Sequence, residues 1–278
     1  MRDDRLKQKI EETVAKASFV LRKDVMRLIK HASRLETNEK AKKALGWILD
    51  NAKIAELKSL AVCQDTGLPV VFIEAGKDIK LSSSAIEAIK KAIESGYRKN
   101  CLRSSIVDPL RREKPTYRGL VYHIDFCHNK KGLKIIILPK GFGSENKTRL
   151  KMFDPTAGSK DIEDFVVESI KKAGPESCPP FVVGIGIGGT SDHALTLAKK
   201  ALLKPLGMVN KDKLLNRLEE SLLAKINSLK IGPMGLGGKT TCLAVRIMKA
   251  PTHIAGLPVG INISCYALRS ASLNLKRI

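Results

Sequence analysis

Long apolar runs and close cysteine pairs are both missing from this 278-residue sequence. No stretch of about 18 apolar residues occurs, which argues against a membrane-spanning helix. The first residues are charged and lack the apolar centre of a secretory signal, so a cytoplasmic location is expected. The six cysteines contain no C-x-x-C pair, which disfavours a disulfide framework or a close-paired zinc site. Ligation of a metal at a site assembled by the fold, catalysis and simple burial remain open for them.

Aromatic and acidic residues are also scarce. Aromatic residues make up 4% of the chain, and 28 acidic residues face 50 basic ones, for a formal net charge of +22. Such a charge attracts polyanions, and a basic nucleic-acid-binding module is one interpretation. It equally suits small dianionic substrates or an acidic partner subunit. Because few aromatic groups are available to stack on bases, nucleic acid is the less favoured partner.

The apolar periodicity alternates between helix and strand and shows no internal repeat or low-complexity linker, which predicts an α/β protein. We expect one compact unit of mixed β-sheets surrounded by α-helices over residues 1–278. Trp47, the only tryptophan, is expected in the core. Helices are expected over 4–33 (one helix or a pair), from 37–38 onward, from a capping box at 84–87 to near 96, and over 159–174, 192–203 and 212–229. Strands are expected over 69–74, 120–126, 133–138 and 181–187 and up to 264, with 120–126 and 133–138 forming a hairpin.

Two glycine-rich segments invite a nucleotide-binding interpretation that their details disfavour. In the run 184–189 the glycines that match the dinucleotide-binding motif G-x-G-x-x-G lie within and just after a predicted strand. No clear ribose-binding acidic residue follows them. In the run 232–241 Pro233 stands where the first glycine of a phosphate-binding loop is required, which argues against an NTPase. Lys239 and its neighbouring glycines remain a possible anion-binding loop.

The segment 63–67, Cys-Gln-Asp-Thr-Gly, lies between a predicted helix and an apolar strand. It suits a metal ligand followed by substrate-binding groups, or equally a small buried thiol followed by a turn. A second cysteine, Cys178, precedes two prolines that hold it in an extended turn. Arg103 lies among small polar residues and is suited to gripping a carboxylate, although a single loop arginine is often only solvated. The loop 141–147 offers backbone N–H groups to an anion, and His253 precedes a Gly-Leu-Pro turn that is equally compatible with a structural role.

Six ordered motifs together resemble the iron–sulfur hydro-lyases, and more narrowly the α subunit, or N-terminal part, of class I fumarases and tartrate dehydratases. The motifs are Cys63-Gln-Asp-Thr-Gly, Leu102-Arg-x-Ser-x-Val-Asp-Pro-Leu110, Gly141-x-Gly-Ser-Glu-Asn-Lys147, Cys178-Pro-Pro with Gly184-Ile-Gly-Ile-Gly-Gly-Thr190, Gly235-x-Gly-Gly-Lys-Thr-Thr241, and His253-x-Ala-x-Leu-Pro-Val259 leading to Cys265. The resemblance covers nearly the whole chain.

The resemblance implies that Cys63, Cys178 and Cys265 hold a [4Fe–4S] cluster in which one iron has no protein ligand. That iron would bind the substrate and act as a Lewis acid. Substrate-binding positions of the family fall on Gln64, Asp65, Arg103, Gly141, Ser144, Asn146, Lys147 and His253. Asp65 and His253 are the two matched residues that can titrate, and they are the candidates for catalysis.

The resemblance also implies a hydro-lyase that interconverts (S)-malate and fumarate, with L(+)-tartrate dehydration as the alternative. Phe142 departs from the family's usual glycine triplet, which makes the backbone contact there less certain. The sequence ends soon after Cys265, whereas fused relatives continue into a second domain with further substrate-binding residues and the proposed carbon base. We therefore expect a separate β subunit, in an assembly of two α and two β subunits, and only trace activity from this chain alone.

Overall fold

The computed structural model describes residues 2–276, and the chain divides into two compact units. Unit 1 comprises residues up to 21, 51–142 and from 269 onward, and unit 2 comprises 22–50 and 143–268. Each unit has a four-stranded mixed sheet with helices packed on it, so the expected α/β class with mixed sheets is confirmed. The extent of the catalytic domain over 1–278 stays a prediction, and residues 1, 277 and 278 lie outside the described part.

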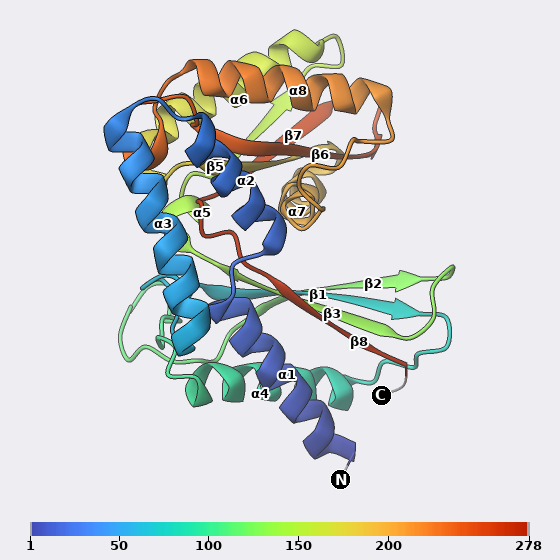
Figure 1. Cartoon of the computed structure of the whole chain (residues 1–278). Helices are drawn as coiled ribbons and strands as arrows, with labels where there is room; N and C mark the ends of the chain where they lie inside the picture. The colour runs from blue at the N-terminus through green and yellow to red at the C-terminus, as the bar shows by residue number, and fades with distance from the viewer. Residues whose placement is uncertain (1, 277–278) are drawn as a thin grey trace. The chain divides into compact units, whose positions relative to one another are not determined.

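Unit 1 is built on a sheet with the strand order β2-β1-β3-β8 (Figure 1). Its elements are α1 (Arg2–Phe19), the second part of α3 (Glu39–Lys58), β1 (Leu68–Gly76), α4 (Ser83–Lys99), β2 (Val121–Cys127), β3 (Leu133–Lys140) and β8 (Ala271–Leu275). The predicted hairpin of the strands at 120–126 and 133–138 is wrong, because β1 lies between them, parallel to β2 and antiparallel to β3. The physical reason is burial. The strongly apolar β1 and β3 take the inner positions, whereas β2, which exposes Val121, Tyr122 and Phe126, takes an edge.

One face of this sheet is covered by α1 and α4, as Figure 1 shows. Ile10 and Val14 of α1 and Ile89 and Ile93 of α4 pack with alternate residues of β1 and β3 to form the core of the unit. Alternation puts every second strand residue on the helix side, so Ile135 and its neighbours at two-residue steps are fully buried there. The helix α4 begins earlier than predicted. Its cap is Ser82, whose Oγ accepts a hydrogen bond from Ala85 N (3.2 Å), and the predicted capping box at 84–87 is wrong.

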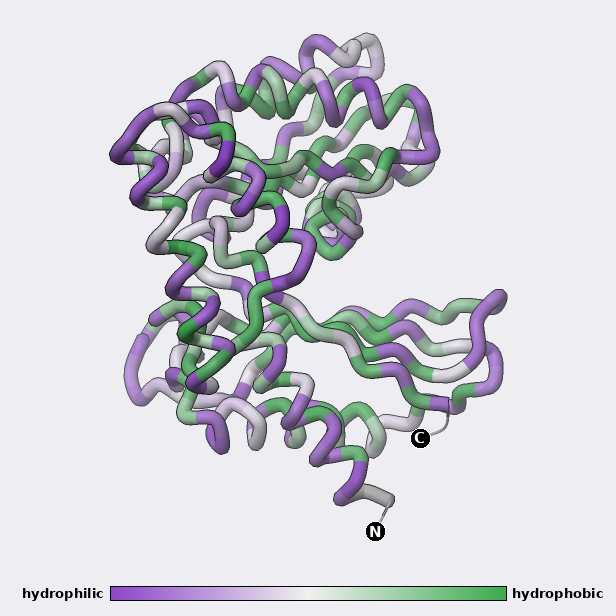
Figure 2. The backbone as a smooth tube through the Cα atoms, viewed as in Figure 1, coloured by the Kyte–Doolittle hydropathy of each residue, from purple (hydrophilic) through white to green (hydrophobic). Residues whose placement is uncertain are grey.

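Unit 2 is built on a sheet with the strand order β4-β7-β5-β6. Its elements are α2 (Lys23–Leu35), the first part of α3, α5 (Phe142–Glu145, apart from its first residue), β4 (Arg149–Phe153), α6 (Ser159–Ala173), the 3-10 turn η1 (Gly174–Ser177), β5 (Phe181–Gly189), α7 (Ser191–Leu202), α8 (Lys213–Ser228), the 3-10 turn η2 (Pro233–Gly235), β6 (Cys242–Thr252) and β7 (Leu257–Ser264). The strand β5 runs parallel to β6 and antiparallel to β7. Figure 2 shows hydrophobic residues along the inner strands and hydrophilic ones at the connecting turns.

The two faces of the unit 2 sheet are covered differently. The helices α6 and α8 bury a large aliphatic core on one face, and α7 packs on the other (Figure 1). The approach of α7 depends on the glycines of β5, since a Cβ atom at Gly184 would lie 2.1 Å from Ala198 O and one at Gly186 would lie 2.0 Å from Ala194 O. The glycine run that resembles a dinucleotide motif therefore allows a helix to lie close to a strand.

A buried ion pair crosses the interior of unit 2. Arg246 of β6 and Glu219 of α8 are 6% and 5% exposed, and Nη1 of the arginine lies 2.7 Å from Oε2 of the glutamate. Arg246 also donates from Nη2 to the carbonyl oxygens of Pro205 and Met208. The pair thus fastens the loop 203–212 to the sheet.

Trp47 does not lie in the core, contrary to the prediction. Its side chain on α3 is 62% exposed, and Nζ of Lys43 lies 5.3 Å from the ring centroid. The buried face of this part of α3 is formed by smaller residues, among them Ala44, Leu45 and Ile48. Within residues 2–276, no helix combines the length and the apolar character that crossing a membrane requires.

Candidate functional site

In unit 1 the loop that carries Cys63 follows α3 and leads into β1, and its backbone is fixed from several sides. Thr66 accepts the backbone N–H of Arg103 on Oγ1 (3.1 Å) and the hydroxyl of Tyr97 on its carbonyl oxygen (3.3 Å). Gly67 has a φ of +79°, and a Cβ atom there would lie 2.6 Å from the carbonyl carbon of Pro139. Only glycine fits this turn. The structure therefore brings the Cys63 and Arg103 motifs together.

The carboxylate of Asp65 joins this loop to the glycine motif at 141. Its Oδ1 accepts the N–H of Gly67 (2.9 Å), and its Oδ2 accepts the N–H of Phe142 (2.7 Å). The side chain of Phe142 is 47% exposed and leaves its backbone N–H free to make this hydrogen bond. Each carboxylate oxygen can accept a second hydrogen bond, so the catalytic or substrate-binding role of Asp65 stays a prediction.

Arg103 lies in the irregular segment after α4 with an exposed side chain. Its backbone is fixed through Thr66, while its guanidinium forms no ion pair within the described part of the chain. An arginine with an anchored backbone and a guanidinium group outside any ion pair can bind a carboxylate through two hydrogen bonds. The adjacent Cys101 is exposed as well, in a left-handed backbone conformation (φ +51°).

In unit 2 the segments of Cys178 and Cys265 lie against each other. The carbonyl oxygen of Cys178 accepts the N–H of Tyr266 at 3.3 Å, which fixes the residue after Cys265 beside Cys178. The prediction of an extended conformation at Cys178 is wrong, because its backbone is left-handed (φ +53°) between η1 and a cis peptide bond at Pro179–Pro180. Both cysteines are half-buried. Of the three predicted cluster ligands, two are thus held in neighbouring rigid turns, and Cys63 belongs to unit 1.

The segment 144–147 forms a tight turn against the unit 2 sheet. Lys147 N donates to the carbonyl oxygen of Ser144 (3.1 Å), and the Lys147 ammonium pairs with the exposed carboxylate of Glu176 in η1. Glu145 is held by the ammonium of Lys199 and by Nδ2 of Asn262 (2.8 Å). These contacts position the predicted substrate-binding residues Ser144, Asn146 and Lys147 beside the η1–Cys178 segment.

Asn262 was not among the predicted site residues. It is 1% exposed in the middle of β7, and its Nδ2 also donates to Oγ1 of Thr148 (2.8 Å). Its Oδ1 has no hydrogen-bond partner among residues 2–276. Arg269 was missed in the same way. It is 3% exposed in unit 1 and donates to the carbonyl oxygen of Asp65. The signal in both cases was a polar residue within or beside an apolar strand.

His253 occupies an exposed turn between β6 and β7. Its Nδ1 accepts the N–H of Ala255 (3.1 Å), and its carbonyl oxygen accepts the N–H of Gly256 (3.2 Å). Because Nδ1 acts as the acceptor, a neutral imidazole carries its proton on Nε2,. His253 is therefore both a turn residue and an available proton donor, and its catalytic role stays a prediction.

The six cysteines differ in how well they suit the predicted cluster. In residues 2–276 no group of three or more His, Cys, Asp or Glu side chains is arranged to hold a metal ion. The chemistry of the thiols nevertheless separates them. Cys63, Cys127, Cys178 and Cys265 are half-buried and Cys101 is exposed, whereas Cys242 is fully buried in β6, where desolvation raises the pKa of its thiol to about 12. A thiol ligates iron as thiolate, so Cys242 is unsuited, and the assignment of Cys63, Cys178 and Cys265 stays a prediction.

The possible anion loop around Lys239 binds an anion of the same chain. The carboxylate of Glu36, which is 3% exposed, accepts the N–H of Lys239 at 2.8 Å. Burial raises the pKa of Glu36, but the backbone N–H groups of Asn38, Lys239, Thr37 and Thr240 outweigh burial and lower it. A Cβ atom at Gly238 would lie 2.7 Å from this carboxylate. The glycines of the loop therefore serve the packing of α2 and α3.

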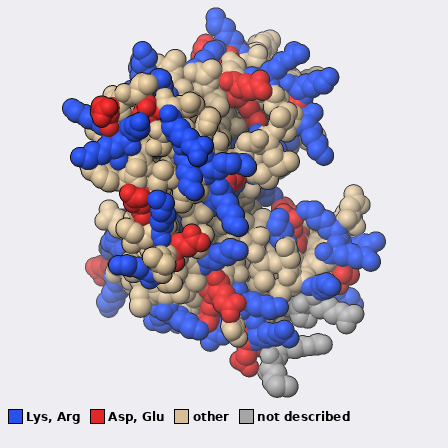
Figure 3. All heavy atoms as spheres, viewed as in Figure 1, with Lys and Arg blue, Asp and Glu red and all other residues tan. Residues whose placement is uncertain are grey.

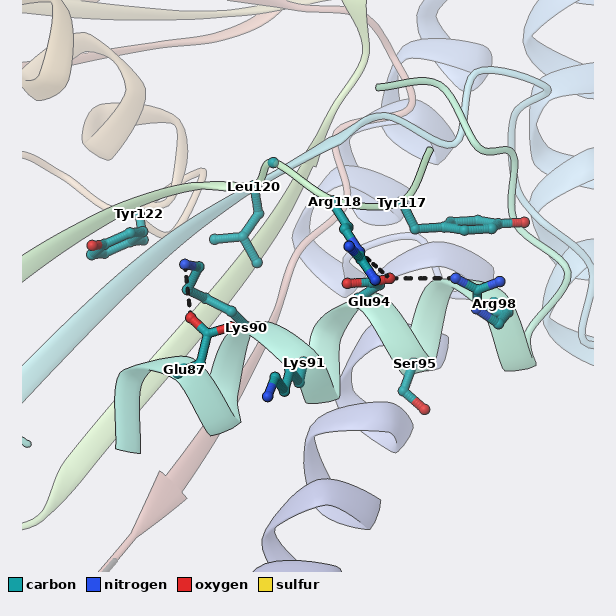
Figure 4. A pocket seen from close by; sticks show the side chains of 11 residues that line it. Glu87, Lys90, Lys91, Glu94, Ser95, Arg98, Tyr117, Arg118, Leu120 and Tyr122 are labelled. Carbon is teal, nitrogen blue, oxygen red and sulfur yellow. Dashed lines mark hydrogen bonds and ion pairs between the residues drawn. The ribbon is translucent and has the colours of Figure 1, made fainter. Parts of the chain in front are cut away.

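A cavity of about 660 Å³ in unit 1 lies between α4 and the segment 117–122 (Figure 4). None of the predicted site residues lines it. Its carboxylates are already paired, Glu87 with Lys90 at 3.0 Å and Glu94 with Arg98 at 3.3 Å. The cavity is a charged surface groove apart from the Cys63 loop.

Comparison with known proteins gives a consistent result. Residues 7–274 match the family model described as fumarate hydratase (fumerase). A putative L(+)-tartrate dehydratase subunit alpha of Methanocaldococcus jannaschii is 45% identical over 274 residues, which cover 96% of this chain and 96% of that protein. The L(+)-tartrate dehydratase subunit alpha of Escherichia coli is 29% identical over 254 residues, which cover 90% of this chain and 84% of that protein.

Proposed function

Because the chain belongs to the fumarate hydratase family, we propose that it is the α subunit of an iron–sulfur hydro-lyase acting on a short 2-hydroxydicarboxylate. L(+)-tartrate is the first candidate substrate. The observation that carries this choice is the 45% identity, over nearly the full length of both chains, to a protein described as a tartrate dehydratase α subunit. Interconversion of (S)-malate and fumarate is the second candidate, favoured by the description of the family model.

Cys63, Cys178 and Cys265 are the proposed ligands of a [4Fe–4S] cluster. The hydrogen bond that joins the Cys178 and Cys265 segments supports two members of this set, and the resemblance of the Cys63 motif to the family supports the third. When bound, the cluster would supply a Lewis-acidic iron for the hydroxyl group that leaves. The other three cysteines have no part in this proposal.

The remaining chemistry falls to the side chains of the chain itself. The open guanidinium of Arg103 would bind one substrate carboxylate, and Gln64 with the backbone at Gly141 would add hydrogen bonds. Ser144, Asn146 and Lys147 would bind the substrate through their donors, with Lys147 exchanging the exposed carboxylate of Glu176 for that of the substrate. Such an exchange costs little, since an exposed ion pair contributes only about 0–1 kcal/mol.

Elimination of water also requires a proton to leave the carbon next to a carboxylate. Asp65 already accepts two backbone N–H groups, which suits it to holding the substrate hydroxyl rather than to removing a carbon proton. His253 would donate or accept a proton at Nε2. We place the carbon base on a β subunit, in keeping with the naming of the relatives as α subunits, and expect two copies of each subunit.

The test is a steady-state comparison of substrates. The chain, co-expressed with its β subunit and reconstituted anaerobically with iron and sulfide, is assayed with L(+)-tartrate for the 2-oxo acid and with (S)-malate for the absorbance of fumarate. We expect kcat/KM for L(+)-tartrate to exceed that for (S)-malate at least tenfold. The reverse ratio would assign the protein to fumarate hydration, and activity on neither substrate with a verified cluster would refute the proposed function.

A further inference from the structure

The helix α2 carries a row of four cations along one face. Lys23, Arg27, Lys30 and Arg34 are all exposed and follow one another at steps of four, three and four residues. At 100° per residue these steps keep all four on one face of the helix, over about 16 Å of its axis. In the part of the chain that the structure describes, none of the four forms an ion pair. Figure 3 shows lysine and arginine side chains gathered over α2.

On two other helices of the same chain, some surface cations are paired with carboxylates. In α4, Lys90 lies 3.0 Å from Glu87 and Arg98 lies 3.3 Å from Glu94. On α8, Lys225 lies 2.6 Å from Glu163 of α6. Like charges at three- and four-residue steps repel one another and weaken an isolated helix. Among the described residues, the row on α2 lacks the carboxylates that offset such repulsion at Lys90, Arg98 and Lys225.

The row is held rigidly on unit 2. Val25, Ile29 and Ala32 bury the opposite face of α2. At its first turn, Arg22 donates to the carbonyl oxygens of Leu202 (2.6 Å) and Lys204 (2.9 Å). Asp24 accepts the N–H of Leu206 at 2.9 Å and pairs with Arg22. A charged surface that is already ordered loses little entropy when a partner binds.

We propose that the row Lys23–Arg27–Lys30–Arg34 is a docking surface for an acidic face of the β subunit. The proposal rests on the proposed function for the identity of that partner. A second copy of this chain does not suit the row, because it carries a formal charge of +22 as well. A single straight row on one helix matches a helix or strand with carboxylates at a similar spacing. Nucleic acid is the weaker candidate, because α2 contains no aromatic residue for base stacking,.

The experiment uses two variants of the full-length chain that lose the same charge. In the row variant, Lys23, Arg27, Lys30 and Arg34 are all changed to Gln. In the control variant, four other exposed cations of unit 2 are changed to Gln, namely Lys160, Lys171, Lys211 and Lys230. Affinity for the purified β subunit is measured by biolayer interferometry at low and at high salt, with circular dichroism as the check of folding.

We expect the row variant to bind the β subunit about 10- to 100-fold more weakly at low salt, mainly through a slower association rate. Its affinity should also lose most of its dependence on salt, whereas the control variant should stay within about twofold of wild type. Equal losses in both variants would show a general charge effect and overturn the proposal, as would no loss in either. If the row variant instead loses binding to duplex DNA or RNA and keeps its affinity for the β subunit, the row serves nucleic acid and the proposal is wrong.

The outcome is separable from that of the proposed function. None of the four residues belongs to the proposed site, so the row variant at saturating β subunit should reach the wild-type kcat. Row-dependent binding without turnover of either dicarboxylate would leave the docking surface standing and remove the hydro-lyase assignment. Full turnover together with binding that does not depend on the row would remove the docking surface and leave the hydro-lyase assignment standing.

Discussion

Replacing Arg246 by Met tests whether the buried ion pair of unit 2 carries the stability that its geometry suggests. The substitution keeps a side chain of similar length but leaves the Glu219 carboxylate, 5% exposed, without its cation. Two donors to that carboxylate remain, Ile247 N at 2.8 Å and Asn210 Nδ2 at 2.9 Å. The loop 203–212 also loses both of its hydrogen bonds from Arg246.

Breaking one side of a buried pair typically costs 3–5 kcal/mol, because the remaining charge is left uncompensated. The two surviving donors place the expected loss for Arg246→Met near the lower end, at about 3 kcal/mol. In the double variant Arg246→Met/Glu219→Gln the buried charge is gone, while the amide oxygen can still accept Ile247 N. We expect the double variant to regain about half of the loss.

Urea unfolding followed by circular dichroism measures both variants, with the slope m as the check that the same surface unfolds. A loss of unfolding free energy below about 1 kcal/mol for Arg246→Met would show that the pair contributes no more than an exposed ion pair. An equal loss in the single and double variants would show that the uncompensated charge is not the cause. Either result would refute the reasoning.

Three further outcomes are expected. Glu36→Gln should destabilise the chain at neutral pH. The difference in free energy of unfolding from wild type should shrink as pH falls below about 4.5, because a carboxyl with a lowered folded pKa stabilises only while ionised,. A difference that stays unchanged with pH in urea titrations would contradict this. Cys242 should react with iodoacetamide only after unfolding, as its pKa of about 12 implies, and peptide mass analysis reads this directly. Asn262→Leu should cost about 1–3 kcal/mol by removing the buried amide donor to Glu145 Oε2 and Thr148 Oγ1,, and a urea midpoint equal to that of wild type would refute it.

The elements of the fold follow closely from local patterns in the sequence. The helices over 159–174, 192–203 and 212–229 were predicted to within a residue or two, because apolar spacing and capping residues act locally. Asp212 illustrates this, since its Oδ1 accepts the N–H of Leu214 and caps α8. Strand pairing is decided by burial over the whole sheet, which is why β1 was not expected between β2 and β3.

The candidate site divides in the same way. The motif residues could be named from their resemblance to a family, and the structure joins the Cys63, Arg103 and Gly141 segments within unit 1 and the Ser144, Cys178 and Cys265 segments within unit 2. The residues that fasten these segments, Arg269 and Asn262, were not predicted. Their partners are backbone atoms or side chains that lie far away in the sequence, at Asp65 and Glu145, and no local pattern encodes such a contact.

The cluster assignment is tested most directly by iron and sulfide analysis of the reconstituted chain. Wild type, with Cys242→Ser as the matched control, is predicted to hold about four iron and four sulfide per chain and to show the charge-transfer absorbance of a [4Fe–4S] centre. Three single variants, each confirmed to be folded by its circular dichroism spectrum, should lose most of this iron and the absorbance: Cys63→Ser, Cys178→Ser and Cys265→Ser. Full iron content in any one of these three variants, or a colourless wild-type protein after reconstitution, would contradict the account.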